Sequence, residues 1–96
     1  MNKVENFFEK LIELKDNNNL TITTIKDVIN KSDFSAEIQV DLIERANRHI
    51  DCNNEENFLV VANYADANTA LECENCYSVI IDSEILEMML EEEEQS

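Results

Sequence analysis

One segment of the chain reads His49-Ile-Asp-Cys52, then twenty residues, then Cys73-Glu-Asn-Cys76, and the fold prediction starts from it. It contains the one histidine of the chain and all three cysteines, in the spacing His-x2-Cys-x20-Cys-x2-Cys. Two residues between the members of a pair let one tight turn aim both side chains at a single ion. Three thiolates and one imidazole suit a closed tetrahedral shell, so the four residues are predicted ligands of a structural zinc ion.

The segment between and after the two pairs favours a small antiparallel sheet. Phe58 to Ala65 is apolar and β-prone, residues 66–68 supply turn chemistry, and Thr69 to Glu72 is short enough for a returning strand. Tyr77 to Asp82 then predicts a third strand. The predicted order is ligand pair, strand, turn, strand, ligand pair, strand.

An all-α alternative exists for this middle part. Glu55 to Ala65 and Ala67 to Val79 contain neither Gly nor Pro, so each stretch can also form a helix. The β-branched and aromatic residues favour strands instead. We therefore predict an α+β fold, with the all-α fold as the alternative.

Residues 70–82, Ala-Leu-Glu-Cys-Glu-Asn-Cys-Tyr-Ser-Val-Ile-Ile-Asp, resemble the second knuckle and last strand of a zinc ribbon. This resemblance implies a ribbon-like unit over residues 49–82 and the same ligands, His49, Cys52, Cys73 and Cys76. Zinc ribbons usually carry Gly in or just after the knuckle, where this chain has Asn75 and Tyr77. The first pair is also His/Cys rather than Cys/Cys.

Two other interpretations of the cysteines stand beside zinc. Cysteine is among the most buried residue types, and the three thiols can simply belong to the core. Redox chemistry or a disulfide between Cys73 and Cys76 is the remaining alternative, which a reducing compartment disfavours.

The length of the chain, 96 residues, predicts one domain, 1–96, with a modest core. Its parts would be a helical part at 1–48, the ribbon-like part at 49–82, and a helix with an acidic tail at 83–96. No apolar run is long enough to cross a membrane and the amino terminus has no signal-peptide pattern. We expect a cytoplasmic protein without membrane contact, in the host cytoplasm if a phage encodes it.

Charge divides the chain into two unlike halves. Residues 1–48 hold nine acids and all seven bases, a net charge of −2, whereas residues 49–96 hold thirteen acids and no Lys or Arg, a net charge of −13. Such a field repels nucleic acid and speeds encounter with basic proteins. The expected partner is therefore a basic, nucleic-acid-binding protein or complex of the host, not nucleic acid itself.

Apolar residues at helical spacing predict three short helices before residue 49 and one after residue 82. The first helix would follow a cap at Asn2, the second a cap at Thr23 or Thr24, the third a cap at Asp33 or Ser35, and the last a cap at Asp82 or Ser83. The predicted buried residues of the first and third helices are Val4, Phe7, Phe8, Leu11, Leu14, Ile38, Leu42, Ile43 and Ala46. The second helix carries Ile25, Val28 and Ile29, and in the last helix Ile85, Leu86, Met88, Met89 and Leu90 are expected to supply apolar contacts. The closing Glu91 to Glu94 run is expected to be a solvated tail.

The second and third predicted helices also have the order of a helix-turn-helix, with Arg45 and Arg48 on its recognition helix. Each arginine, however, has an acidic residue four positions earlier, Asp41 and Glu44. Because these partners use up the positive charge, we expect a helical bundle rather than a DNA reader.

The sequence contains few of the motifs that enzymes use for catalysis. It has one histidine, no Gly-rich phosphate loop and no nucleophile motif with a nearby base. A zinc shell filled by four protein ligands would leave no position for substrate. We therefore expect a protein that is not an enzyme.

In size, acidity and lack of enzymatic motifs the chain resembles DNA-mimic proteins of phages and mobile elements, including anti-CRISPR proteins. This resemblance implies an inhibitor whose carboxylates replace phosphates on a nucleic-acid-binding surface of its partner. The alternative function is a zinc-stabilised adaptor that binds proteins. The predicted contact residues are Glu55, Glu56, Asp66, Glu72, Glu74, Glu84 and Glu87.

Overall fold

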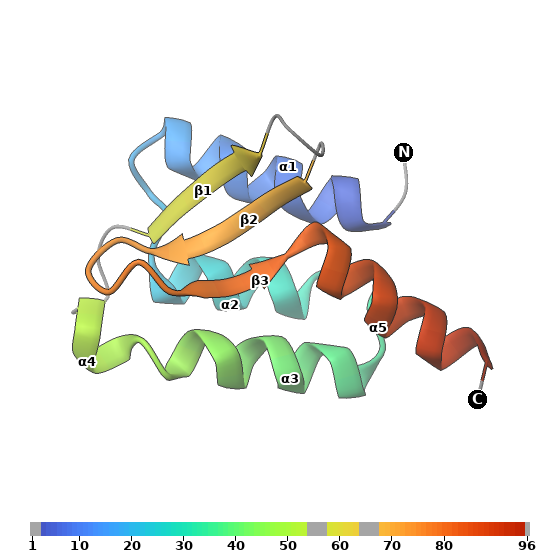
Figure 1. Ribbon diagram of the computed structural model, residues 1–96. Coiled ribbons are helices and arrows are strands. Elements are labelled where there is room, and N and C mark those ends of the chain that lie inside the picture. Colours follow the sequence, from blue (N-terminus) through green and yellow to red (C-terminus); the bar gives the residue numbers. More distant parts are fainter. Residues whose placement is uncertain (1–2, 54–57, 64–67, 96) are drawn as a thin grey trace.

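The computed structural model describes residues 3–53, 58–63 and 68–95. Helices and strands follow one another along the chain as Figure 1 shows. Their bounds are α1 (Lys3–Asp16), α2 (Ile22–Asn30), α3 (Ala36–Asn47), α4 (Ile50–Asn53), β1 (Phe58–Asn63), β2 (Asn68–Cys73), β3 (Val79–Asp82) and α5 (Ser83–Gln95). The predicted α+β class is confirmed, with strands rather than helices in the middle of the chain.

The sheet is antiparallel throughout and has the order β1-β2-β3. Leu71 on the central strand lies opposite Val60 of β1 and Ile81 of β3. Both Leu71 and Ile81 are fully buried. The β2–β3 register is irregular between Leu71 and Glu72, just before the second ligand pair. A bulge of this kind bends a strand and changes the direction of its end.

Helix α1 supplies the aromatic part of the core. Its buried stripe is Val4, Phe7, Phe8 and Leu11, as the spacing predicted, and Leu14 is half-buried. The Phe7 ring meets the rings of Phe8 and Phe34 edge to face, with centroids 5.3 and 5.6 Å apart. This geometry is favoured for aromatic pairs. Helix α1 lies behind β1 and β2 in Figure 1 and contacts β1, α2 and α5.

The caps of α2 and α3 fix where these helices begin. The predicted cap of α2 at Thr23 or Thr24 is wrong, because Thr21 is the N-cap. The Thr21 hydroxyl accepts from the Thr24 backbone N–H at 3.2 Å, and the Thr24 hydroxyl accepts from the Thr21 N–H at 2.9 Å. This reciprocal pair starts the helix early enough to bury Ile22. Ser35 caps α3, as expected, and accepts from the Ile38 N–H at 3.3 Å.

The helices and the sheet share one cluster of buried side chains. Its members are Val4, Phe7, Phe8, Leu11, Leu20, Ile22, Ile25, Val28, Ile29, Phe34, Ile38, Leu42, Ala46, Leu71, Cys73, Ile80, Ile81 and Leu86. Cys73 therefore belongs both to the core and to the predicted ligand set. Burial of this apolar surface is the main force that holds the helices against the sheet.

Helix α5 begins where β3 ends, because the Asp82 carboxylate accepts from the Ile85 N–H at 2.8 Å. Leu86 is fully buried against the core, whereas Ile85 and Met88 are 36% and 53% exposed. Of the residues predicted to supply apolar contacts, Leu86, Met89 and Leu90 pack in or against the core, whereas Ile85 and Met88 do not. A helix turns about 100° per residue, so Ile85 lies about 100° and Met88 about 160° around the axis from Leu86. The helix continues through Gln95, so the acidic run is helical rather than a separate tail.

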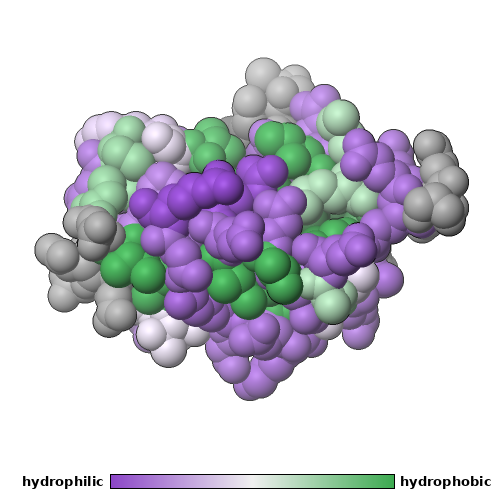
Figure 2. Space-filling model, turned by 90° about the horizontal axis from the view of Figure 1, so that it is seen from below, coloured by the Kyte–Doolittle hydropathy of each residue, from purple (hydrophilic) through white to green (hydrophobic). Residues whose placement is uncertain are grey.

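No helix within the described ranges is both long enough and apolar enough to span a membrane. Figure 2 shows the face seen from below, on the side of α3. Hydrophilic side chains cover much of this face, and hydrophobic groups reach the surface between them. Val40 on α3 is an exposed apolar residue, and 55% of its surface is accessible to solvent.

Candidate metal centre

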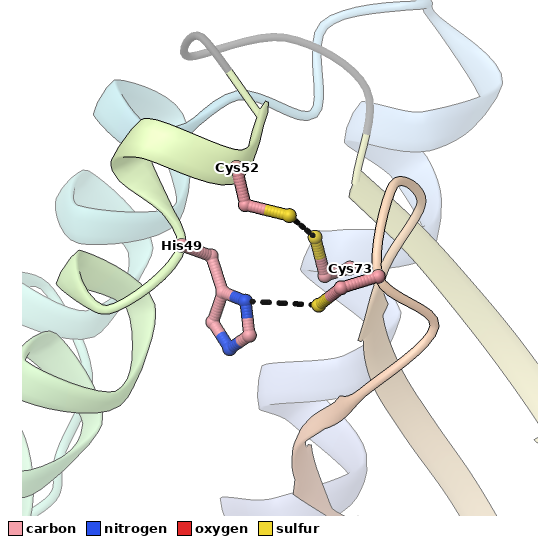
Figure 3. A group of neighbouring side chains, drawn as sticks. His49, Cys52 and Cys73 are labelled. Carbon is pink, nitrogen blue, oxygen red and sulfur yellow. Dashed lines mark hydrogen bonds between the residues drawn. The ribbon is translucent and has the colours of Figure 1, made fainter.

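Four predicted ligands come together from two segments of the chain. His49 follows the end of α3, and its backbone N–H donates to the Ala46 carbonyl at 3.1 Å. Cys52 lies one turn later, on the short helix α4. Cys73 ends β2 and Cys76 lies in the loop before β3. In Figure 3, His49 and Cys52 point from the helical side toward Cys73 on the strand side.

The ligand atoms of the four residues all lie within 4.8 Å of one another. The Cys52 and Cys73 sulfurs are 3.6 Å apart, and Cys76 Sγ is 3.5 Å from His49 Nδ1. Around a tetrahedral zinc, two thiolates would be about 3.8 Å apart and a thiolate and an imidazole nitrogen about 3.6 Å apart. Both close pairs therefore already have the separation that one metal ion requires.

The group lies at the boundary between core and solvent. Cys73 is fully buried, His49 and Cys52 are half-buried, and Cys76 is exposed. All three cysteines are free, so the disulfide alternative for Cys73 and Cys76 is not realised. The core-thiol interpretation holds for Cys73 and in part for Cys52, which packs against the core, but not for exposed Cys76.

The backbone of residues 73–78 forms a tight loop that presents the second pair. The Cys73 N–H donates to the Ser78 carbonyl at 3.0 Å, and the Tyr77 N–H donates to the Cys73 carbonyl at 2.9 Å. Tyr77 has a φ of 59°, in the left-handed region that favours glycine. It is the position just after the knuckle, where zinc ribbons usually have Gly. The loop thus has the turn that the resemblance implied, built with a residue that is strained there.

A side-chain contact ties this loop to the first pair. The Asn75 amide donates to the Cys52 backbone carbonyl, across the gap between α4 and the loop. This hydrogen bond joins α4 to the loop of residues 73–78 without the help of a metal ion. Such support around a metal site orients the ligands before an ion binds.

Hydrogen bonds make the thiols unequal. The Ser78 hydroxyl and then its backbone N–H stabilise the Cys76 thiolate and lower the pKa of Cys76 to about 6. The hydrogen bond with Cys73, followed by burial, raises the pKa of Cys52 to about 11. One negative charge is thus accommodated by the protein itself, whereas further thiolates in the same cluster need a cation. A bound divalent ion supplies that charge and deprotonates coordinating thiols.

The first ligand pair corrects one part of the ribbon expectation. Its residues lie at a helix end and on a helical turn, α4, rather than on a knuckle between strands. In a helix, residues three apart face the same side, so His-x2-Cys converges there as well as in a knuckle. The coarser expectation holds: a candidate His/Cys group lies beside a small antiparallel sheet.

Four of the seven predicted acidic contact residues lie within the described part of the chain. Glu55, Glu56 and Asp66 lie outside the described residues. Glu72 and Glu74 are half-buried beside the metal ligands, whereas Glu84 and Glu87 are exposed on α5. The structure adds exposed Glu91 and Glu92 to the second set. Glu91 follows Glu87 by four residues, so the helical spacing was a signal that these two lie on one face of the helix.

Of the two ion pairs predicted for Arg45 and Arg48, the structure shows one. Arg45 Nε donates to Asp41 Oδ1 at 2.9 Å, as expected, and Arg45 Nη1 also donates to the Ile80 carbonyl at 3.3 Å. Glu44 and Arg48 do not form the second predicted ion pair. Arg45 therefore joins α3 to the outer edge of β3, which makes it unsuitable for phosphate contact.

Comparison with known proteins gives no relative for this chain. No protein-family model matches it, and neither does any curated protein or solved structure.

Proposed function

We propose that His49, Cys52, Cys73 and Cys76 hold one structural zinc ion. The observation that supports this is the convergence of three sulfurs and one imidazole nitrogen within 4.8 Å. Thiolate and imidazole ligands select zinc over the oxygen-preferring ions calcium and magnesium. Four protein ligands fill a tetrahedral shell, so the ion would stabilise the fold and leave no open position for catalysis.

The zinc ion would join two parts of the chain that are far apart in sequence. Cys52 and Cys73 are separated by 21 positions, and their segments meet at one end of the molecule. Metal binding would therefore fix the end of α3 against the β2–β3 loop. In small metal-binding domains this binding energy is folding energy.

Metal content tests this site directly. Protein purified without chelator is expected to carry one zinc per chain, and Cys76→Ser is expected to lose it. Ser78→Ala is the matched variant, because it keeps all four ligands and removes only the hydroxyl next to Cys76. It should retain zinc with about tenfold lower affinity. Unmutated protein without stoichiometric metal, melting alike with and without chelator, would eliminate the site.

We further propose that the protein acts without catalysis, as an acidic inhibitor that occupies a nucleic-acid-binding surface of a basic partner. One observation carries this proposal: residues 49–96 contain thirteen acids and no Lys or Arg, and α5 exposes several of these carboxylates together. Carboxylates one helical turn apart are about 5 to 6 Å apart, of the same order as phosphates along a strand.

A zinc-stabilised adaptor is the second candidate, and a different observation favours it. Tyr77 is 75% exposed and Val79 is 50% exposed, directly after the second ligand pair. Tyrosine is enriched among the residues that anchor protein interfaces, and the apolar Val79 side chain extends the surface around it. An adaptor would use this apolar surface and would not compete with nucleic acid.

A pull-down from host lysate with competing duplex DNA separates the two functions. DNA should displace the partner of an inhibitor and leave the partner of an adaptor bound. The charge-reversal variant Glu84→Lys/Glu87→Lys should abolish capture of the inhibitor's partner. Glu9→Lys/Glu13→Lys is the matched control, because these glutamates are equally exposed on α1. Partner capture that survives the α5 reversal at both low and high salt would refute the inhibitor.

A further inference from the structure

The outward face of α5 differs from an ordinary solvated helix face. Ile85 and Met88 are exposed, and they lie one helical turn apart on the same side. Leu86 occupies the inner face, so α5 has apolar side chains on two sides. A single exposed apolar residue such as Val40 on α3 is normal for a soluble protein. Two at helical spacing form a stripe that a second helix can cover.

Carboxylates border this stripe on the side of the carboxyl terminus. Glu91 and Glu92 follow Met88 by three and four residues and so lie next to its side chain on the helix surface, whereas Glu87 flanks the stripe about 100° around the helix axis. All three are exposed, and the last turn of α5 contains no basic residue. The carboxyl end of a helix carries partial negative charge, which these carboxylates reinforce. Cations brought by another molecule would relieve this repulsion.

The helix is fixed in place before any partner arrives. The Asp82 carboxylate caps its first turn, and the Ser35 hydroxyl donates to the Glu93 carboxylate near its other end. A groove of about 260 Å³ lies between α3 and α5, next to this face. Its lining is Glu37, Ile38, Asp41, Met89, Glu92 and Glu93. It has the charge and size to receive one lysine or arginine side chain of a partner.

We propose that the outer face of α5, with Ile85 and Met88 at its centre and Glu87, Glu91 and Glu92 at its rim, docks a basic amphipathic helix of a protein partner. This inference rests on the proposed function only in taking the partner to be basic. The stripe accepts apolar side chains spaced three and four residues apart, and methionine adapts its shape to them. Lysine or arginine beside that apolar row meets the rim carboxylates. Surfaces that imitate phosphates by charge alone do not need the apolar stripe.

Two synthetic peptides of leucine and lysine serve as probes. In the first, the leucines share one helical face, and in the second the same residues are scrambled so that they do not. Binding is measured by fluorescence anisotropy of labelled peptide on the metal-loaded protein. The amphipathic peptide is expected to bind about tenfold more tightly than the scrambled one, since only it buries leucines on the stripe.

The variants separate the stripe from the charge. Ile85→Ser/Met88→Ser should weaken the amphipathic peptide about tenfold and leave the scrambled peptide unchanged. Val40→Ser, which removes an equally exposed apolar residue from α3, is the control and should change neither. Glu87→Gln/Glu91→Gln/Glu92→Gln should weaken both peptides and flatten the salt dependence. Circular dichroism of each variant verifies its fold.

The possible failures are distinguishable. Equal binding of the two peptides, or an Ile85→Ser/Met88→Ser variant that binds like the unmutated protein, overturns the docking inference and leaves the acidic surface of the proposed function standing. If neither peptide binds at low salt, both the docking inference and the acidic surface are refuted.

Discussion

The end of the molecule that carries the His/Cys group and the end formed by α5 use polar side chains in opposite ways (Figure 1). At the His/Cys end, four ligand atoms from two segments meet within 4.8 Å, and hydrogen bonds hold their segments together. On α5, exposed glutamates lie along one helix with no base in its last turn. At the His/Cys end the polar side chains converge on one point, whereas on α5 they point into solvent.

The two arrangements should therefore have opposite effects on the stability of the fold. A ligand set that closes on one ion gains stability from binding it. Like charges one turn apart on a helix repel each other, and at its carboxyl end they also oppose the helix dipole. Changes at the His/Cys end should therefore destabilise the protein, and neutral substitutions on α5 should stabilise it.

Removal of metal should have the largest effect. If zinc is bound as proposed, a chelator should lower the melting temperature by more than about 10 °C, because structural zinc contributes several kcal/mol in small domains. Differential scanning calorimetry with and without chelator measures the shift. Glu87→Gln is the control and should show the same shift. If substitution on α5 changed the melting temperature and the chelator did not, the His/Cys group would not be the part that stabilises the fold.

Thiol reactivity should rank the cysteines in the metal-free, folded protein. At pH 7 iodoacetamide should modify Cys76 on the order of a hundredfold faster than Cys52, because Cys76 is exposed and its lowered pKa of about 6 makes it mostly thiolate, whereas the pKa of Cys52 is raised to about 11. The rate at Cys76 should fall as the pH drops through about 6, where the thiolate becomes protonated. Mass spectrometry of the labelled peptides gives the order, with buried Cys73 last.

Zinc should protect all three thiols from the reagent if they share one ion. Protection of Cys76 alone would separate it from the other two sulfurs and break the four-ligand group.

Replacement of the strained residue after the second pair should stabilise the fold. Tyr77→Gly is expected to raise the free energy of unfolding by about 1 kcal/mol, because glycine adopts the left-handed backbone without a Cβ clash. Urea denaturation of the metal-loaded protein measures it. Asn18→Gly, at the other left-handed position, should gain less, since asparagine tolerates that conformation. Asn75→Gly, without positive φ, should destabilise. A loss of stability in Tyr77→Gly would mean that the exposed ring contributes more than the strain costs.

The smallest effect is expected on α5. Glu87→Gln/Glu91→Gln should raise the free energy of unfolding by about 0.2 to 0.5 kcal/mol at low salt, because it removes a like-charge pair four residues apart. The gain should shrink in high salt, which screens exposed charges. Thermal unfolding at two salt concentrations tests this, with Glu9→Gln/Glu13→Gln as the matched pair on α1. Destabilisation by the α5 substitution would show that these carboxylates support the fold.

Sequence patterns predicted the two regions with unequal success. The spacing of His49, Cys52, Cys73 and Cys76 predicted the group that the structure assembles, because short intervals restrict where side chains can point. The strands between the pairs were also predicted, from β-branched residues. On α5, Ile85 and Met88 were predicted to supply apolar contacts together with Leu86, but they are exposed, because apolar character alone does not show which side of a helix the core covers.

Local turns were predicted least well, for a similar reason. The α2 cap lies at Thr21 because Thr21 and Thr24 bond each other reciprocally, a choice among several nearby threonines that their residue type does not reveal. Tyr77 takes a backbone conformation that its residue type disfavours, and loop closure at Cys73 and Ser78 imposes it.

Residue type and spacing were enough to predict the α+β composition, the helical stripes of the amino-terminal half, the four candidate ligands and the concentration of negative charge after Arg48. These features depend on a few neighbouring positions of the chain. Packing determines that the first ligand pair is helical, that Cys73 is buried and Cys76 exposed, and that α5 exposes an apolar stripe. Those features depend on which surfaces pack together, and packing joins residues that no local pattern connects.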